Sequence, residues 1–175
     1  GKTTLFNLLT GEQKEKSVKL FTTLSTTVRR VKINHEVALI SDTVGFISKI
    51  PAYMIEAFKS TLEELLYADI VLVIIDASDG LFELRKKFRS CYGTLIEIGV
   101  EPNKMTFVLN KSELLTNDEI LNKVDYLELK ENKEWIDISA ITEKNIDKLK
   151  KSIGKVFQNN VSQNNKSVGV KAHGN

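Results

Sequence analysis

Two short runs of the chain are apolar at almost every position. Residues 70–77 (IVLVIIDA) and 105–109 (MTFVL) are rich in β-branched and other apolar side chains, as expected of strands buried on both faces. Such strands are typical of a parallel sheet that helices cover on each side. Residues 37–41 and 135–139 indicate two further strands, and the more polar residues 28–33 suit an edge strand paired with 37–41.

Between these runs, apolar residues recur at steps of three and four positions. The pattern extends over residues 55–66, 84–95 and 146–157, and it is typical of helices with one buried face. Thr116 followed by Glu119 fits a capping box, which predicts that a further helix begins there. Strand and helix therefore alternate, and this order predicts an α/β domain with a mostly parallel sheet and helices on both faces.

The end of the chain has a different composition. After Gln158 large apolar residues are few, and Asn, Ser and Gly are frequent. Such a segment cannot bury enough surface to offset the entropy lost on ordering. We therefore expect one domain over residues 1–158 and a flexible tail over residues 159–175.

Composition narrows the class of protein only a little. The formal net charge of the 175 residues is +2, which gives no argument for nucleic-acid binding. Cys91 is the single cysteine, so the chain has no internal disulfide, as is usual in a reducing compartment. No apolar run reaches about 18 residues, the minimum for a membrane-spanning helix. We predict a monomeric, cytoplasmic domain without a membrane span.

The chain begins with GKTT, the second half of the phosphate-binding motif GxxxxGK[ST]. In that motif Gly1 allows close approach to phosphate, Lys2 reaches the β- and γ-phosphates, and the Thr3 hydroxyl binds Mg²⁺. Thr4 then continues the helix whose N-terminus faces the phosphates. By itself GKT also fits an exposed turn, so this interpretation needs support from elsewhere in the chain.

That support comes from DTVG, residues 42–45, directly after the strand predicted at 37–41. In a DxxG motif Asp42 holds Mg²⁺ through a water molecule, and the Gly45 N–H bonds the γ-phosphate. DxxG is common in turns, but its position at the end of a strand favours the phosphate-sensing role.

NKSE follows the strand at 105–109 and matches the Asn-Lys-x-Asp pattern of guanine sites, with Glu113 in place of aspartate. A carboxylate there accepts two hydrogen bonds from N1–H and the exocyclic amine of guanine, which adenine does not offer. Lys111 would lie along the base, and Asn110 would tie neighbouring loops together. Ser139 and Ala140 follow the last predicted strand, where a backbone N–H meets the guanine carbonyl oxygen.

A threonine-rich segment, KLFTTLSTTVRR, lies between the first two motifs. It suits a switch loop that closes over Mg²⁺ and the γ-phosphate and opens after hydrolysis. We predict that Thr23 makes this contact, with Thr26 and Thr27 as alternatives. The other interpretation is a loop whose threonines satisfy local backbone groups.

These motifs carry a specific resemblance. KLFTTLSTTVRR, the stretch from Asp42 to Glu64 (DTVGFISKIPAYMIEAFKSTLEE) and VIIDASD at residues 73–79 are similar to segments of the HflX family of GTPases. The likeness extends to about Gln158. It implies a P-loop fold, GTP and GDP as substrate and product, Mg²⁺ as cofactor, and binding to the large ribosomal subunit. In such a site Lys2, Thr23 and Gly45 would act in catalysis, and Thr3, Thr23 and Asp42 would hold the metal.

The chain also departs from the full pattern. The first strand of a P-loop sheet and the start of the phosphate loop would lie outside these 175 residues. Glu113 is one methylene longer than the usual aspartate, which puts guanine affinity in question. Phe46 follows DxxG, as in the family, where Ras-like proteins have a water-orienting glutamine, so intrinsic hydrolysis should be slow.

Two alternative functions remain open from sequence alone. One is a nucleotide-binding module that docks on ribosomes with negligible turnover, and the other is an ATP-using P-loop enzyme, which NKSE disfavours. The basic run LRKKFR (84–89), with Arg29 and Arg30, is a candidate for contact with ribosomal RNA phosphates. The alternative for this run is a solvated helix face.

Overall fold

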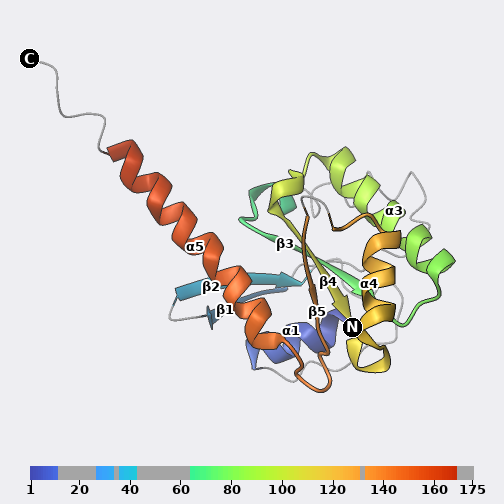
Figure 1. Ribbon diagram of the computed structural model, residues 1–175. Coiled ribbons are helices and arrows are strands. Elements are labelled where there is room, and N and C mark those ends of the chain that lie inside the picture. Colours follow the sequence, from blue (N-terminus) through green and yellow to red (C-terminus); the bar gives the residue numbers. More distant parts are fainter. Residues whose placement is uncertain (12–26, 34–35, 43–63, 131–132, 169–175) are drawn as a thin grey trace, which may run out of the picture.

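The computed structural model describes residues 1–11, 27–33, 36–42, 64–130 and 133–168 (Figure 1). The strands are β1 (Thr27–Ile33), β2 (Glu36–Asp42), β3 (Val71–Asp76), β4 (Met105–Asn110) and β5 (Glu134–Asp137). The α-helices are α1 (Lys2–Thr10), α3 (Leu81–Ile98), α4 (Asn117–Tyr126) and α5 (Ile146–Val168), with short 3₁₀ helices at Glu64–Tyr67, Pro102–Lys104 and Ser112–Leu114. Most of the helix predicted over residues 55–66 lies outside the described residues.

The described strands form two sheets. β3, β4 and β5 make a parallel three-stranded sheet in that order, and β1 pairs with β2 as an antiparallel hairpin. The predicted pairing of residues 28–33 with 37–41 is confirmed, since Val31 lies opposite Ala38. In the parallel sheet Asp76 lies opposite Asn110. The carboxyl ends of β3 and β4 therefore lie side by side, and the loops that follow them start from one edge.

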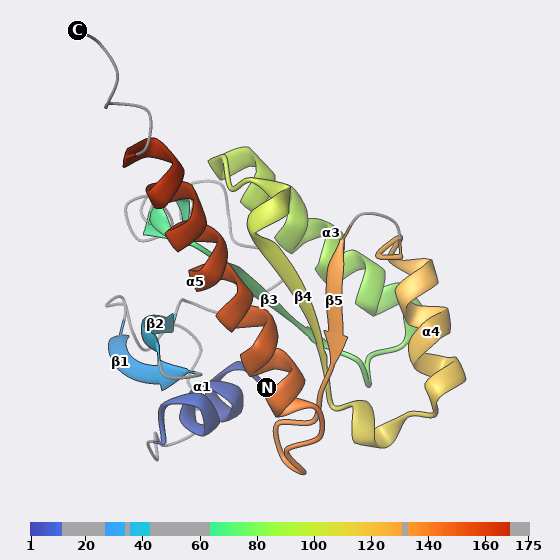
Figure 2. The same ribbon diagram turned by 60° about the vertical axis from the view of Figure 1, so that its left-hand side comes forward.

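Helices cover both faces of the parallel sheet, as predicted. Figure 2 shows α5 on one side of the sheet and α3 and α4 on the other. Alternate side chains divide between two cores, because successive residues of a strand point to opposite faces. Phe107 packs in the core under α3 and α4, and Val108 packs in the core with α1, α5 and the hairpin. All six positions of β4 are buried, which accounts for its mostly apolar sequence; Thr106 and Asn110 are its buried polar residues.

The hairpin and the parallel sheet approach each other without pairing through any described strand. A cavity of about 580 Å³ lies between β2 and β3, with α1 and α5 contributing to its walls. A parallel strand in this position would lie beside β2 on one side and β3 on the other. The expected first strand of a P-loop sheet stays a prediction.

Two helix boundaries predicted from the sequence can be compared with the structure: the start of α4 and the end of α5. The capping box that starts α4 is confirmed, because Thr116 and Glu119 each bond the other's backbone. The last helix was expected to end near Phe157, but α5 continues to Val168, past the predicted domain end at Gln158. Its polar residues are compatible with helix even where apolar periodicity stops. The division into domain and tail stays a prediction.

Candidate functional site

The N-terminus of α1 lies against the carboxyl end of β4. A methyl group added at Gly1 would lie 3.1 Å from Nδ2 of Asn110, so the absence of a side chain permits this approach. The Gly1 carbonyl accepts a hydrogen bond from Leu5 N at 3.0 Å, which starts the helix. The first turn, which contains Thr3 and Thr4, carries no acidic residue. The backbone N–H groups and the positive pole at the N-terminus of a helix make such a terminus suitable for an anion.

Asn110 joins the loops after β4 and β5. It is 4% exposed, and its Oδ1 accepts a hydrogen bond of 3.0 Å from Ala140 N. Two backbone hydrogen bonds support the same junction: Ile138 N donates to Leu109 O at 2.8 Å, and Ser112 N donates to Ile138 O at 3.0 Å. The amide side chain thus makes the loop-tying contact that the NKSE motif predicts.

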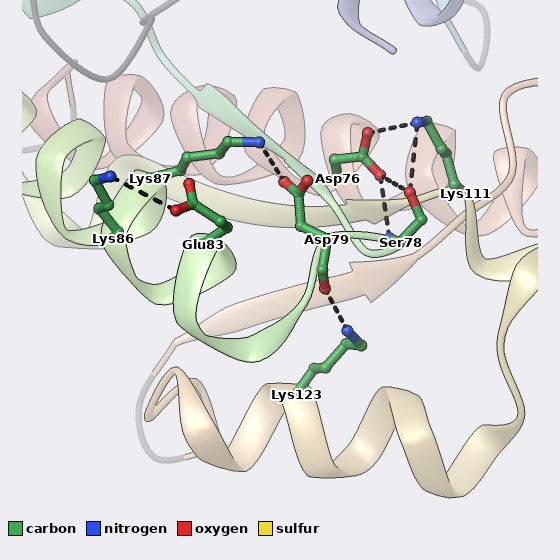
Figure 3. Close-up of polar contacts among 8 residues, drawn as sticks. All are labelled: Asp76, Ser78, Asp79, Glu83, Lys86, Lys87, Lys111 and Lys123. Carbon is green, nitrogen blue, oxygen red and sulfur yellow. Dashed lines mark hydrogen bonds and ion pairs between the residues drawn. The ribbon is translucent and has the colours of Figure 1, made fainter.

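The next residue, Lys111, makes the closest ion pair of this region (Figure 3). Its backbone is left-handed at φ 69°, and its Nζ lies 2.5 Å from Oδ2 of Asp76. The other oxygen of Asp76 accepts hydrogen bonds from Ser78 N at 3.1 Å and Ser78 Oγ at 2.6 Å. Burial works to raise the pKa of Asp76, but the bonds from Lys111 and Ser78 outweigh it and hold that pKa below its usual value.

Glu113 places a buried carboxylate oxygen in the same loop. Its Oε2 is inaccessible to solvent and has no hydrogen-bond partner among the described residues. The residue belongs to the short 3₁₀ helix Ser112–Leu114, which begins directly after Lys111. A buried acceptor without a donor is costly, so a ligand that supplies N–H groups would stabilise this loop.

The loop after β5 is held by its own serine. Ser139 is fully buried, and its Oγ accepts a hydrogen bond of 3.0 Å from Thr142 N. Ser139 N donates to Lys144 O at 3.1 Å, so the serine orders a turn that holds Ala140 beside Asn110. The Ala140 N–H itself is used by Asn110.

Lys2 lines two cavities that residues of β2, β3 and β4 also line. It lines a cavity of about 300 Å³ together with Gly1, Asp76 and Asn110. It also lines the larger cavity with Ser41, the neighbour of Asp42 in β2. The structure therefore brings the predicted residues of GKTT, NKSE and the serine-alanine loop to one edge of the fold.

The remaining predicted residues lie at the limit of the description. Asp42 is the last residue of β2 and pairs in register with Thr27, and only the backbone of both is described. Thr23, Thr26 and Gly45 lie outside the described residues. No group of three or more His, Cys, Asp or Glu side chains in the described part of the chain gathers as a metal site. The assignment of Mg²⁺ to Thr3, Thr23 and Asp42 stays a prediction.

The basic run on α3 is engaged with acidic groups of the chain itself. Arg85 pairs with Glu128 at 3.0 Å, and its guanidinium lies 4.6 Å from the centre of the Tyr126 ring. Lys86 and Lys87 also form ion pairs, the second one with Asp79 at 2.7 Å (Figure 3). These contacts favour a solvated helix face for LRKKFR over an RNA-binding surface.

Cys91 is unreactive in this environment. Its thiol lies in α3 against the core, and burial raises its pKa to about 11. The thiolate is therefore rare at neutral pH, and the side chain serves in packing. No helix among the described residues is long and apolar enough to cross a membrane.

The sequence motifs give no role to Asp76 and Ser78, although both lie in VIIDASD, which carries part of the family resemblance. Their position in the sequence could have indicated a role. Asp76 is the last residue of the buried strand β3, and β3 lies beside β4, the strand that leads into NKSE. In a parallel sheet, the side chains after neighbouring strands meet at one edge. The pairing of Asp76 with Lys111 follows from that rule once β3 and β4 are known to be neighbours.

Comparison with known proteins decides the family. A family model described as a 50S ribosome-binding GTPase matches residues 1–111. GTPase HflX of Methanocaldococcus jannaschii is 42% identical over 128 residues, which cover 71% of this chain and 32% of that protein. The chain belongs to the HflX family of GTPases. GTPase HflX of Saccharolobus solfataricus is 36% identical over 160 residues, covering 87% of this chain and 44% of that protein.

Solved structures agree with the family and the fold. A GTP-binding protein from Sulfolobus solfataricus in complex with GDP superposes with a TM-score of 0.70 at 32% identity, covering 89% of this chain and 48% of that one. Translation elongation factor SelB from Methanococcus maripaludis has a TM-score of 0.61 at 20% identity over 91% of this chain and 31% of that one, and shows the P-loop GTPase fold alone. The chain spans about a third of the M. jannaschii HflX protein.

Proposed function

We propose that this chain is the GTPase domain of an HflX-like protein, a Mg²⁺-dependent switch that binds GTP and hydrolyses it to GDP and phosphate. The observation that carries the proposal is the convergence at Asn110. Its buried side chain lies where a methyl group added at Gly1, at the start of α1, would come within 3.1 Å of it, and it holds Ala140 N in the loop after β5. Phosphate-binding and base-binding groups thereby share one side chain, as a nucleotide bound across the strand ends requires.

Each motif then takes one part of the nucleotide. Lys2 and the N–H groups of the first turn of α1 bind phosphate oxygens. Thr3 and Thr23 would supply oxygen ligands, the donors that Mg²⁺ prefers, and Asp42 would hold the metal through a water molecule. Thr23 with Gly45 would contact the γ-phosphate. The metal, when bound, neutralises charge that develops on the phosphates.

The other end of the site recognises the base. The buried Oε2 of Glu113, without a partner among the described residues, is offered as the acceptor for guanine N–H groups. Lys111 lies along the ring, and the loop of Ser139 and Ala140 lies beside the base. The Ala140 N–H, predicted to meet the guanine carbonyl oxygen, donates to Asn110 Oδ1 instead. Adenine lacks the matching donors, so the site should prefer GDP to ADP.

Competition titration tests this assignment. The 175-residue chain, with Mg²⁺ and a fluorescent GDP analogue bound, is challenged with unlabelled GDP or ADP. We expect GDP to displace the analogue at least about 100 times more effectively than ADP, because a base that leaves a buried acceptor unpaired is strongly rejected. Equal displacement by ADP would exclude a guanine site and favour the ATP-using alternative.

Ribosome binding belongs to the same proposal and rests on the family. The large ribosomal subunit is the proposed partner. More specifically, we propose that Arg29 and Arg30 contact ribosomal RNA. Because Phe46 cannot orient water, one alternative is a docking module that binds nucleotide without useful turnover. Phosphate release over many turnovers, measured with and without large ribosomal subunits, separates the two: stimulation supports a switch, and no release in either case supports a docking module.

Shortening the acidic side chain of the base site should improve binding. Glu113→Asp is expected to tighten GDP binding about fivefold, because the shorter carboxylate accepts both guanine hydrogen bonds without displacing the loop. The measurement is equilibrium titration with the fluorescent analogue. The matched control is Glu97→Asp, because Glu97 is an exposed residue of α3. Equal or weaker binding by Glu113→Asp would contradict the base-contact role.

A further inference from the structure

We propose that Asp76 is a positioning residue for Lys111: its carboxylate, itself held by Ser78, fixes the lysine side chain and thereby sets the affinity for guanine nucleotides. The inference deepens the proposed function and rests on it, because Lys111 is assigned to the nucleotide there. Asp76 and Ser78 make no contact with the nucleotide in this scheme. They act through Lys111 alone.

Backbone pairing brings the two residues together. Asp76 lies opposite Asn110 in the parallel register of β3 and β4. Ala77 N donates to Asn110 O at 2.8 Å, so the pairing continues one residue past the end of β3. Lys111 therefore leaves the sheet at a fixed point, directly beside Asp76.

The conformation of Lys111 is itself selected by its surroundings. Its φ of 69° and ψ of 31° are unusual for a residue with a side chain, and such a backbone persists where neighbouring contacts enforce it. The left-handed turn starts the 3₁₀ helix that carries Glu113. One turn thus sets the direction of the lysine and the start of the base-binding loop.

The two oxygens of Asp76 have separate partners. Oδ2 pairs with Lys111 Nζ at 2.5 Å, and Oδ1 accepts from Ser78 N and Ser78 Oγ. The Ser78 hydroxyl also lies 3.4 Å from Lys111 Nζ, so the ammonium has two oxygens on one side (Figure 3). A carboxylate held at one oxygen cannot rotate freely, and its other oxygen becomes a fixed anchor.

This anchoring matters because lysine is a flexible side chain. Its four-carbon stem has many rotamers, and ordering that stem on ligand binding lowers affinity. A pair formed before the nucleotide arrives removes part of that loss. Both side chains are 36% exposed, so the pair itself adds little to folding stability, and its loss leaves the domain folded.

A second Asp–Lys pair close by provides the matched control. Asp79 pairs with Lys87 at 2.7 Å, and its backbone carbonyl accepts a hydrogen bond of 2.7 Å from Lys123. These bonds join the loop after β3 to α3 and α4, away from Lys111. Asp79→Asn makes the same chemical change three residues along the chain, and its GDP affinity should stay within about twofold of the original.

The test is a double-mutant cycle on the 175-residue chain. Affinity for a fluorescent GDP analogue is measured for the original chain, Asp76→Asn, Lys111→Ala and the double variant, with thermal midpoints recorded without nucleotide. We expect Asp76→Asn to weaken binding roughly tenfold, as for one charge-assisted hydrogen bond. On the Lys111→Ala background the same change should weaken binding less than about twofold. Ser78→Ala should lower affinity to a smaller extent, because Asp76 then loses one support.

Several results would overturn the inference. Additive losses would show that Asp76 acts independently of Lys111, and unchanged affinity would show an ordinary surface pair. Tighter binding would show that Asp76 competes with the nucleotide for the lysine. An equal loss in Asp79→Asn would point to the loop as a whole. If the original chain does not prefer GDP to ADP, the proposed function fails with it, whereas a GDP-selective chain insensitive to Asp76→Asn refutes the positioning role alone.

Discussion

Replacing Asn110 with alanine is expected to lower GDP affinity by at least about 100-fold, because one side chain joins the phosphate and base ends of the site. The change removes the hydrogen bond to Ala140 N and the amide group that lies beside Gly1. It also leaves the Ala140 N–H without its acceptor, which should cost about 1–3 kcal/mol of folding stability. GDP titration and urea unfolding measure the two effects separately.

The matched control for this variant is Asn117→Ala. Asn117 is exposed at the first position of α4, so its loss should leave GDP affinity within about twofold and stability within about 0.5 kcal/mol. An Asn110→Ala chain that binds GDP within threefold of the original would show that the nucleotide is not held at this junction. A loss of stability with unchanged affinity would give Asn110 a purely structural role.

The largest expected loss of stability comes from Phe107→Ala. Phe107 is 1% exposed, and its ring lies 5.5 Å from that of Phe88 and 6.1 Å from that of Tyr92, measured between centroids. Truncation leaves a cavity between β4 and α3, and such changes cost about 3–5 kcal/mol. Urea unfolding, followed by far-ultraviolet circular dichroism, measures the shift in midpoint.

Phe82→Ala is the control for that experiment. Phe82 is the second residue of α3 and is 74% exposed, so the same truncation should change the free energy of unfolding by less than about 0.5 kcal/mol. If Phe107→Ala costs no more than Phe82→Ala, the aromatic contact between β4 and α3 does not support the sheet. The site at the end of β4 would then need another source of rigidity.

Sequence alone was sufficient for the elements whose burial is complete. β4 is buried at every position and mostly apolar, with Thr106 and Asn110 as its polar residues, and the capping box predicted the start of α4. The end of α5 was not predicted, because a periodic pattern of apolar residues indicates only the part of a helix that packs against the core. Backbone hydrogen bonds can continue a helix beyond that part. The helix beyond Phe157 has no apolar stripe to reveal it.

In the candidate site, too, some contacts could be predicted from the sequence and others could not. Motif position predicted that Asn110 ties neighbouring loops together, and its Oδ1 accepts a hydrogen bond of 3.0 Å from Ala140 N. The predicted contact of that N–H with the guanine carbonyl oxygen stays a prediction. The partner of Lys111 was not predicted, since Asp76 is distant in sequence and becomes its neighbour only through the pairing of β3 with β4. Single-sequence reasoning finds residues that a motif names, but a contact between two loops depends on strand order.

Asn110 is the last residue of β4, in which every position is buried. A ligand bound beside Asn110 should therefore stabilise the whole sheet. Backbone amides of β4 exchange with deuterium only when the domain opens globally, and a ligand that binds the folded form makes such openings rarer. Saturation with GDP at 100 times its dissociation constant should therefore slow deuterium uptake in β4 about 100-fold. Deuterium exchange in the interior of the domain would then show whether nucleotide occupies the pocket at the edge of the sheet.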